Sequence, residues 1–260
     1  MAVALRHLLV EDDLPAVVIT LNNPEKMNAL SVALMTELTA ELRRQAGRDD
    51  VQVVVIRGAG RAFSAGHDLR EMVDKSLEEE REVFETCERL MATVQGIPQP
   101  VIASVHGIAT AAGCQLVAAC DLAVASEEAR FATNGIRNGI FCYTPMVPVS
   151  RAIGRKRALE MVLTGNFIDA QTAEHWGLVN RVVAAARLDA EVRELAHQIG
   201  SLSPVAVRTG KAAFYEQIDS SQAEAYALMT EAISTNALSD DAQEGMSAFL
   251  QKRKPTWTGK

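Results

Sequence analysis

The chain has 260 residues, of which 48% are hydrophobic and 23% are charged, and this composition excludes a disordered or collagen-like protein. Its 26 basic and 33 acidic residues give a net charge of −7, which argues against a broad basic surface for nucleic acid or anionic lipid. The four cysteines form no C-x-x-C pair and have no histidines at zinc spacing, so we expect reduced thiols and no metal site.

The N-terminal sequence MAVALRHLLVEDD lacks the pattern of a signal peptide. No run of the chain reaches 18 apolar residues, because even the apolar stretch 101–125 is interrupted by His106, Gln115 and Asp121. We therefore expect no membrane span and a cytoplasmic location, as in a bacterial protein. A mitochondrial location would require a presequence that is missing from this chain.

Strand and helix patterns alternate in the first half of the chain. The β-branched runs 16–21 and 51–57 end at turn-forming residues and predict strands. Between them, Ser31 is the predicted N-cap of a helix with apolar residues at helical spacing. Further patterns predict a helix at 77–95 and strands at 101–105 and 122–125. This order is typical of an α/β fold with parallel strands.

Helical periodicity dominates from about residue 145 onward, with a single short strand predicted near 179–183. The predicted helices lie at 159–163, 187–199, 205–215, 223–233 and 242–250. We divide the chain into a mixed α/β core, residues 1–200, and a helical C-terminal region, residues 201–260. The apolar faces of the late helices must pack on the core or on neighbouring subunits, so we do not expect a monomer.

Two junctions that follow buried strands are rich in small residues, namely 61–69 (RAFSAGHDL) and 106–116 (HGIATAAGCQL). Small residues allow a ligand to approach the backbone, and a helix beginning after Ala112 would direct free N–H groups at that ligand. Two N–H groups that converge on one oxygen form an oxyanion hole. The same residues would also suit two tight turns that serve packing alone.

Four segments resemble, in order and spacing, the enoyl-CoA hydratase (crotonase) superfamily over nearly the whole chain. They are 23–30 (NPEKMNAL), 62–69 (AFSAGHDL), 107–121 and 248–254 (AFLQKRK). One branch of the superfamily is most similar, through SAGHD at 64–68, AAGCQL at 111–116 and FLQKRKP at 249–255. The resemblance implies a ClpP-like spiral of β-β-α turns and a helical C-terminal trimerisation region, in a homotrimer or a hexamer built as a dimer of trimers.

The resemblance also implies an acyl-CoA substrate, with coenzyme A arriving as part of that substrate and no covalently bound cofactor. Matched by position, the backbone N–H groups that would hold the thioester oxygen belong to His67 and Ala112. Positive charge near the site would come from Lys26, Arg61, Arg70 and Lys252. Residues matching CoA or acyl contacts are Lys26, Met27, Asn28, Ala65, Gly66, Asp68, Leu69, Arg70, Phe249 and Lys252.

The resemblance implies that a hydratase of this superfamily has two glutamates that activate water. The matching positions in this chain hold Gln115 and Gly135. Neither residue can transfer a proton at neutral pH, so efficient 2-enoyl-CoA hydration is not expected. Substitute acid–base groups could come from His67, His106, Asp68, Cys142 or Tyr143. Tyr143 matches an aspartate of a dienoyl-CoA isomerase relative. For Asp68 we expect instead a helix cap near 69–73, and for His106 a loop-anchoring hydrogen bond.

Three functions stay open for this chain. The preferred one is a lyase, hydratase or isomerase of fatty acid metabolism with relocated acid–base groups. The others are a thioesterase or decarboxylase that uses mainly the oxyanion hole, and a non-catalytic acyl-CoA binder or regulatory subunit.

Two other signals are discounted. Ser64 precedes Asp121 and the histidines His175 and His197 in serine-hydrolase order, but its loop lacks the first glycine of a nucleophile elbow. The Gly58-Ala-Gly60 loop lacks the third glycine of a dinucleotide site.

Overall fold

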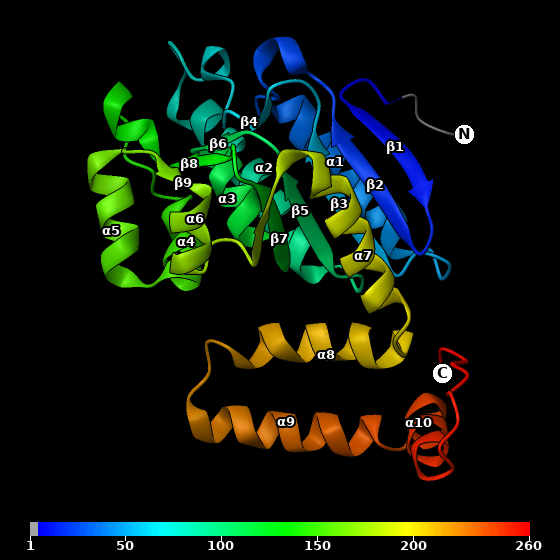
Figure 1. Ribbon diagram of the computed structural model, residues 1–260. Coiled ribbons are helices and arrows are strands. Elements are labelled where there is room, and N and C mark those ends of the chain that lie inside the picture. The colour runs from blue at the N-terminus through cyan, green and yellow to red at the C-terminus, as the bar shows by residue number, and fades with distance from the viewer. Residues whose placement is uncertain (1–4) are drawn as a thin grey trace.

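A six-stranded sheet forms the centre of the core in the computed structural model, which describes residues 5–260 (Figure 1). β1 and β2 are antiparallel, and every other neighbouring pair is parallel. The central strands are almost fully buried, as expected for a parallel sheet with helices on both faces. In spatial order the strands are β1 (Leu8–Asp13), β2 (Ala16–Leu21), β3 (Val53–Gly58), β5 (Val101–Val105), β7 (Leu122–Ser126) and β10 (Arg181–Val183).

A second, four-stranded sheet is built from short strands, three of which follow a strand of the first sheet. β3, β5 and β7 lead into β4, β6 and β8 after short loops, and β4 and β6 are followed by helices. Each of these three turns of the chain therefore places one strand in each sheet, which confirms the β-β-α spiral expected from the sequence. In spatial order these strands are β4 (Ala62–Ser64), β6 (Ile108–Thr110), β8 (Arg130–Ala132) and β9 (Ile168–Asp169).

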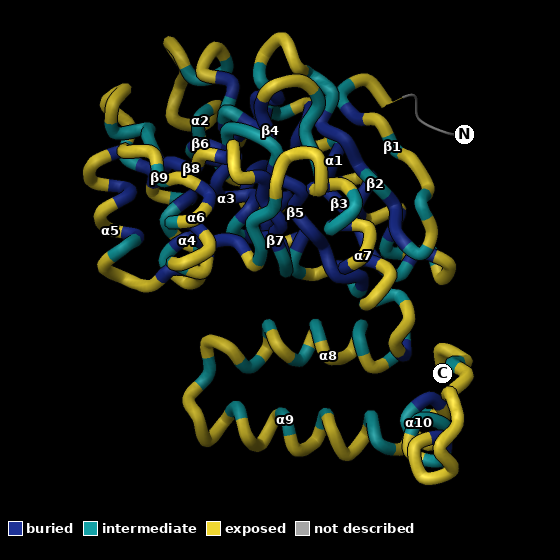
Figure 2. Tube along the Cα trace, in the orientation of Figure 1, coloured by how far each residue is buried: buried dark blue, intermediate teal, exposed yellow. Residues whose placement is uncertain are grey.

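Helices cover both faces of the larger sheet. The main hydrophobic core lies on the side of α1 (Val32–Ala46), α2 (Leu77–Gly96) and α3 (Ala112–Ala119), and α7 (Leu188–Gly200) packs on the opposite face. The remaining helices of the core are α4 (Met146–Ile153), α5 (Arg155–Thr164) and α6 (Ala170–Trp176). Figure 2 shows that buried residues concentrate in the sheets and in α3.

The predicted strands and long helices are present, and the Ser31 hydroxyl caps α1 by accepting from the Leu34 N–H at 3.2 Å. β1 escaped prediction because its exposed acidic residues break any apolar pattern at this edge of the sheet. The strands of the smaller sheet are only two or three residues long, too short for an alternating pattern. α4 and α6 were also not assigned separately, since each spans only about two turns.

The C-terminal region begins after α7 and consists of α8 (Pro204–Gln217), α9 (Gln222–Asn236) and α10 (Asp240–Leu250). α8 and α9 form a helical hairpin that lies beside the core (Figure 1). Neither helix has a buried residue in the single chain. Among residues 5–260, no helix has the length and apolarity needed to cross a membrane.

A buried ion pair joins α8 to the core. Lys211 Nζ lies 2.7 Å from Asp121 Oδ2 and donates to the carbonyl oxygens of Val94 and Gln99, each at 2.9 Å. The Tyr215 hydroxyl donates to Asp121 Oδ1 at 2.8 Å. Burial lowers the pKa of Lys211 and raises the pKa of Asp121, and the attraction between the two charges offsets part of both effects. Each charge is therefore tolerated only while its partner is present.

We predict that Lys211→Met lowers the free energy of unfolding by about 3–5 kcal/mol, because it leaves the Asp121 carboxylate buried without its counter-ion. Urea unfolding followed by circular dichroism, at equal protein concentrations, measures the change. The matched control is Lys156→Met on the exposed surface of α5, which should stay within about 0.5 kcal/mol of the unmodified chain. Equal losses in both variants would contradict this role of the ion pair.

Candidate functional site

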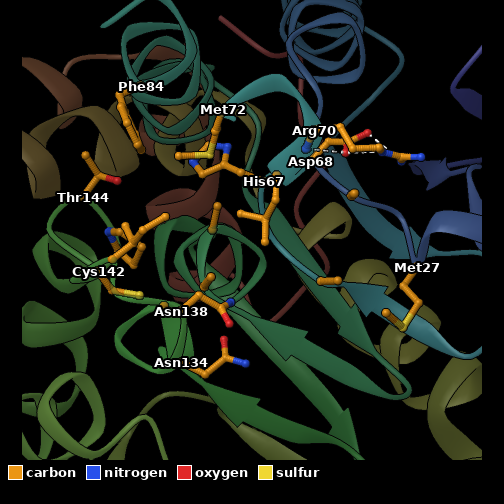
Figure 3. A pocket seen from close by; sticks show the side chains of 18 of the residues that line it. Met27, His67, Asp68, Arg70, Met72, Phe84, Asn134, Asn138, Cys142 and Thr144 are labelled. Carbon is orange, nitrogen blue, oxygen red and sulfur yellow. Dashed lines mark hydrogen bonds and ion pairs between the residues drawn. The ribbon is translucent and has the colours of Figure 1, made fainter. Parts of the chain in front are cut away.

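A pocket of about 860 Å³ opens at the edge of the core where the two small-residue junctions meet. Its walls come from the 3₁₀ turn Pro24–Lys26, the segment after β4, the start of α3, and residues 134–145. Figure 3 shows the side chains of Phe84 and Thr144 at one end and those of Asp68 and Arg70 at the other, with His67 between them. The volume falls in the range of small-molecule sites.

Two glycines bring the backbone after β4 against the start of α3. Gly66 has a φ of 88°, and a Cβ there would lie 2.9 Å from the Cβ of Ala111 and 3.1 Å from the nitrogen of Ala112. A Cβ on Gly113 would collide with the carbonyl oxygen of Ser64. Only residues without a side chain permit this approach, so the glycines place His67 beside Ala112.

The backbone N–H groups of His67 and Ala112 border this pocket without a partner. Neither group donates a hydrogen bond to another described residue, whereas the adjacent Gly66 carbonyl accepts from the Leu30 N–H at 2.7 Å. Ala112 is the first residue of α3, where N–H groups have no intrahelical acceptor. The preceding Ala111 has a strained φ of 49° and supplies no side-chain cap. Two free donors are thus fixed on one side of the pocket.

The imidazole of His67 lines the pocket between these donors and α2. Its ring packs edge-on against Phe84, with the ring centroids 5.4 Å apart. Both ring nitrogens are shielded from solvent and neither makes a hydrogen bond of good geometry, although the Leu30 backbone interacts with the ring. Burial lowers the pKa of His67, and the Leu30 backbone offsets only part of this effect. The ring is therefore neutral at neutral pH.

Asp68 forms ion pairs with two cationic side chains at the end of the pocket opposite Phe84 and Thr144. It pairs with the guanidinium of Arg70, with Asp68 Oδ1 2.8 Å from Nε, and lies 3.6 Å from Lys26 Nζ. The hydrogen bond from Arg70 lowers the pKa of Asp68. Its carboxylate also accepts from the Arg70 N–H and caps the 3₁₀ turn Leu69–Glu71, as the sequence predicted. A permanently ionised, paired carboxylate suits positioning rather than proton transfer.

The structure places several predicted residues outside this pocket. The Asn28 side chain is fully buried and donates to the carbonyl oxygens of Ala59 and Ala62, each at 2.8 Å, so it braces the loop. Gln115 is buried in α3, with its Oε1 3.7 Å from the Cys87 Sγ. The pocket lining includes neither residue, because both side chains are turned into the core.

His106 and the C-terminal residues also lie away from the pocket of their own chain. His106 Nε2 lies 2.8 Å from the Gly60 carbonyl oxygen, the loop-anchoring contact that the sequence predicted. Phe249, at the end of α10, is 82% exposed, and Lys252 follows it. Figure 1 places α10 on the far side of α8 from β4, so neither residue reaches the pocket of the same chain.

Gly135 lies in the pocket wall at a position too tight for any side chain. A Cβ on Gly135 would lie 2.6 Å from the carbonyl oxygen of Ile140 and 3.0 Å from the Sγ of Cys142. Cys142 is buried, which raises the pKa of its thiol, whereas Tyr143 is 68% exposed. Both line the pocket, as do the predicted Met27, Ala65 and Leu69.

Several lining residues had no sequence signal. Phe84 is one apolar residue of a long amphipathic helix, and Asn134, Asn138 and Thr144 belong to a segment without periodicity. The described residues contain no group of three or more side chains suited to hold a metal ion.

Comparison with known proteins gives consistent matches. A family model described as enoyl-CoA hydratase/isomerase matches residues 15–260. Mitochondrial enoyl-CoA hydratase domain-containing protein 3 of Mus musculus is 46% identical over 241 residues, which are 92% of this chain and 80% of that protein. A crystal structure of an enoyl-CoA hydratase from Mycobacterium smegmatis has a TM-score of 0.95 and 47% identity, covering 97% of this chain and 99% of the other.

The crystal structure of human enoyl-CoA hydratase domain-containing protein 3 also has a TM-score of 0.95, with 45% identity, and covers 97% of this chain and 100% of the other. The superfamily and the branch indicated by the sequence motifs are thereby confirmed. The predicted cytoplasmic location is wrong by the same comparison, because the relatives of this branch are named mitochondrial. That prediction rested on the composition of the N-terminal segment.

Proposed function

Because this chain belongs to the enoyl-CoA hydratase/isomerase family, we propose that it binds an acyl-CoA thioester in the pocket and polarises the thioester carbonyl through its backbone. The observation that carries this proposal is the pair of unpartnered N–H groups of His67 and Ala112 at the contact of Gly66 with the start of α3. These two groups would form an oxyanion hole for the thioester oxygen.

The charge distribution along the pocket favours one orientation of the substrate. Lys26 and Arg70 lie at the Asp68 end and would attract the phosphates of coenzyme A. Phe84, Ile140 and Phe141 line the apolar part, which would receive the acyl chain. The thioester would then lie in the middle, where the free donors are. Lys26 and Arg70 thus supply local positive charge at the pocket in a chain whose net charge is −7.

The donors act when negative charge develops on the thioester oxygen. Removal of a proton next to the carbonyl, or attack on the carbonyl carbon, moves an electron pair onto that oxygen. Fixed N–H groups stabilise the charge without reorganisation, and each is worth roughly 10²–10³ in rate. The N-terminal position of Ala112 in α3 adds the favourable end of the helix dipole. The backbone thereby supports any reaction that passes through an enolate or a tetrahedral anion.

Removal of the Ala112 N–H tests this proposal. We predict that Ala112→Pro abolishes the shift of the carbonyl ¹³C resonance that a bound acyl-CoA shows with the unmodified chain, because proline has no N–H. The strained Ala111 could make this variant misfold, so a second form replaces the Ala112 amide by a backbone ester. An undiminished carbonyl shift in the folded ester form would contradict the assignment.

Water addition is not the reaction that these residues favour. Gln115 carries no titratable group, and Gly135 has no room for a carboxylate. We predict that crotonyl-CoA binds but is hydrated with a kcat below the roughly 1–10³ s⁻¹ typical of enzymes, and that Gln115→Glu alone does not restore hydration. Stopped assays at saturating crotonyl-CoA measure both. Ordinary hydration rates would mean that other residues activate water, and binding with no turnover of any thioester would favour a non-catalytic binder.

Self-association is the second part of the proposal. Large apolar side chains are exposed on the C-terminal helices, among them Phe214, Ile233, Leu238 and Phe249. Such faces favour association with other copies of the chain, as a trimer or a dimer of trimers. Phe249 and Lys252 would contact coenzyme A only where a neighbouring subunit brings them to a pocket.

Analytical ultracentrifugation at micromolar concentration checks the assembly. We predict a mass that is a multiple of three chains of 28.1 kDa, because the exposed apolar faces of α8 to α10 are then covered. A mass of 28.1 kDa under these conditions would refute self-association.

A further inference from the structure

The middle of the pocket contains one imidazole, that of His67, and few other groups able to move a proton. The remaining titratable lining residues are Glu25, Lys26, Asp68, Arg70, Cys142 and Tyr143. Asp68 is paired with both Lys26 and Arg70 at the coenzyme A end, and Glu25 shares the 3₁₀ turn of Lys26. Burial disfavours ionisation of the Cys142 thiol. His67 therefore stands apart as the titratable group that belongs to the same residue as one of the free donors.

The His67 ring lacks the partners that the other buried polar groups of the loop possess. Both of its nitrogens are buried and unpaired, whereas the buried Ser64 hydroxyl of the same loop donates to the Asn28 carbonyl oxygen at 2.9 Å. A buried, unsatisfied polar group is costly, and use by a ligand or a reaction is one physical reason for a protein to retain it. An imidazole is nearly as bulky as the Phe84 ring beside it, so packing alone does not require nitrogen atoms here.

We propose that the His67 imidazole is the catalytic base that removes a proton from the acyl carbon next to the thioester carbonyl. The proposal rests on the proposed function, in which the N–H of the same residue holds the thioester oxygen. His67 would thus supply both the backbone N–H that holds the thioester oxygen and the ring that takes the proton. Because both belong to one residue, the ring stays close to the thioester carbonyl. The ring nitrogens are shielded, so the acyl group reaches them only if a neighbouring side chain such as the flexible Met72 changes rotamer.

The chemistry balances with this one group. The C–H bond breaks, its proton moves to the unprotonated ring nitrogen, and its electron pair forms an enolate whose oxygen is held by the two N–H groups. If the protonated ring exchanges its proton with solvent before the proton returns to the same carbon, the α carbon acquires a solvent hydrogen. With a 3-enoyl-CoA, return to the far carbon of the allylic system gives the conjugated 2-enoyl-CoA. This 1,3-proton shift needs no water, oxidant or second carboxylate, so it agrees with Gln115 and Gly135 at the positions of the missing glutamates.

The test uses 3-butenoyl-CoA in D₂O, with deuterium at the α carbon and conjugated product followed by mass spectrometry and NMR. His67→Ala keeps the backbone N–H and removes only the ring. We expect the unmodified chain to catalyse both events and His67→Ala to lose about 10²–10⁴ in kcat, with the Kd and the bound carbonyl shift retained. His67→Gln should be as slow as His67→Ala, and added imidazole should restore part of the rate in His67→Ala.

The pH profile gives an independent readout. The base must be unprotonated, and burial sets the pKa of His67 below its usual value of about 6.5, so kcat/KM should rise with pH below 6.5 and stay level above it. His67→Ala should lack this limb, and the exposed control His175→Ala on α6 should retain it.

The outcomes separate this proposal from the proposed function. Undiminished exchange in His67→Ala overturns the role of the ring. Binding and carbonyl polarisation by the unmodified chain without exchange or isomerisation also overturns it, while the proposed function stands. A chain that binds no acyl-CoA overturns both.

Discussion

The whole site depends on one close approach between two backbone segments, the turn after β4 and the start of α3. Gly66 and Gly113 make this approach possible, because a Cβ on either residue would collide with the opposing segment. The contact leaves the N–H groups of His67 and Ala112 free side by side while their neighbours are paired. The spiral makes this contact possible, since β4 pairs with β6 and thereby brings together the two segments that follow these strands.

Backbone donors and side-chain acids are subject to different constraints in such a fold. The donors depend on the course of the chain and not on which side chains it carries, since every residue but proline has a backbone N–H. Acid–base groups are side chains and can be lost or replaced one at a time. Here the loop from Gly135 to Cys142 is packed too tightly for a carboxylate, and a neutral imidazole lies next to the donors instead. The oxyanion donors therefore remain available in this chain even though a side chain able to activate water is absent from position 135.

The C-terminal helices are attached to the core by polar contacts more than by apolar packing. Lys211 and Tyr215 of α8 converge on the buried carboxylate of Asp121, and no apolar residue of α8 is buried. A region held in this way keeps its apolar faces available to other chains. The same attachment fixes where α10 lies, and it leaves Phe249 far from the pocket of its own chain.

The sequence by itself determined the features that local patterns encode. β-branched runs identified the buried parallel strands, Ser31 and Asp68 were recognisable as caps, and the small-residue motifs identified the family and the residues whose N–H groups border the pocket. The tertiary structure alone decided which side chains share the pocket. Phe84 comes from α2 and Thr144 from a loop sixty residues later, and neither carries a local signal of its place. It also decided that Asn28 and Gln115 face the core, that Gly135 has no space for a side chain, and that the ring of His67 has no partner. Periodicity and caps arise between near neighbours in the chain, whereas a pocket is made by contacts between distant segments, and only the folded chain brings those together.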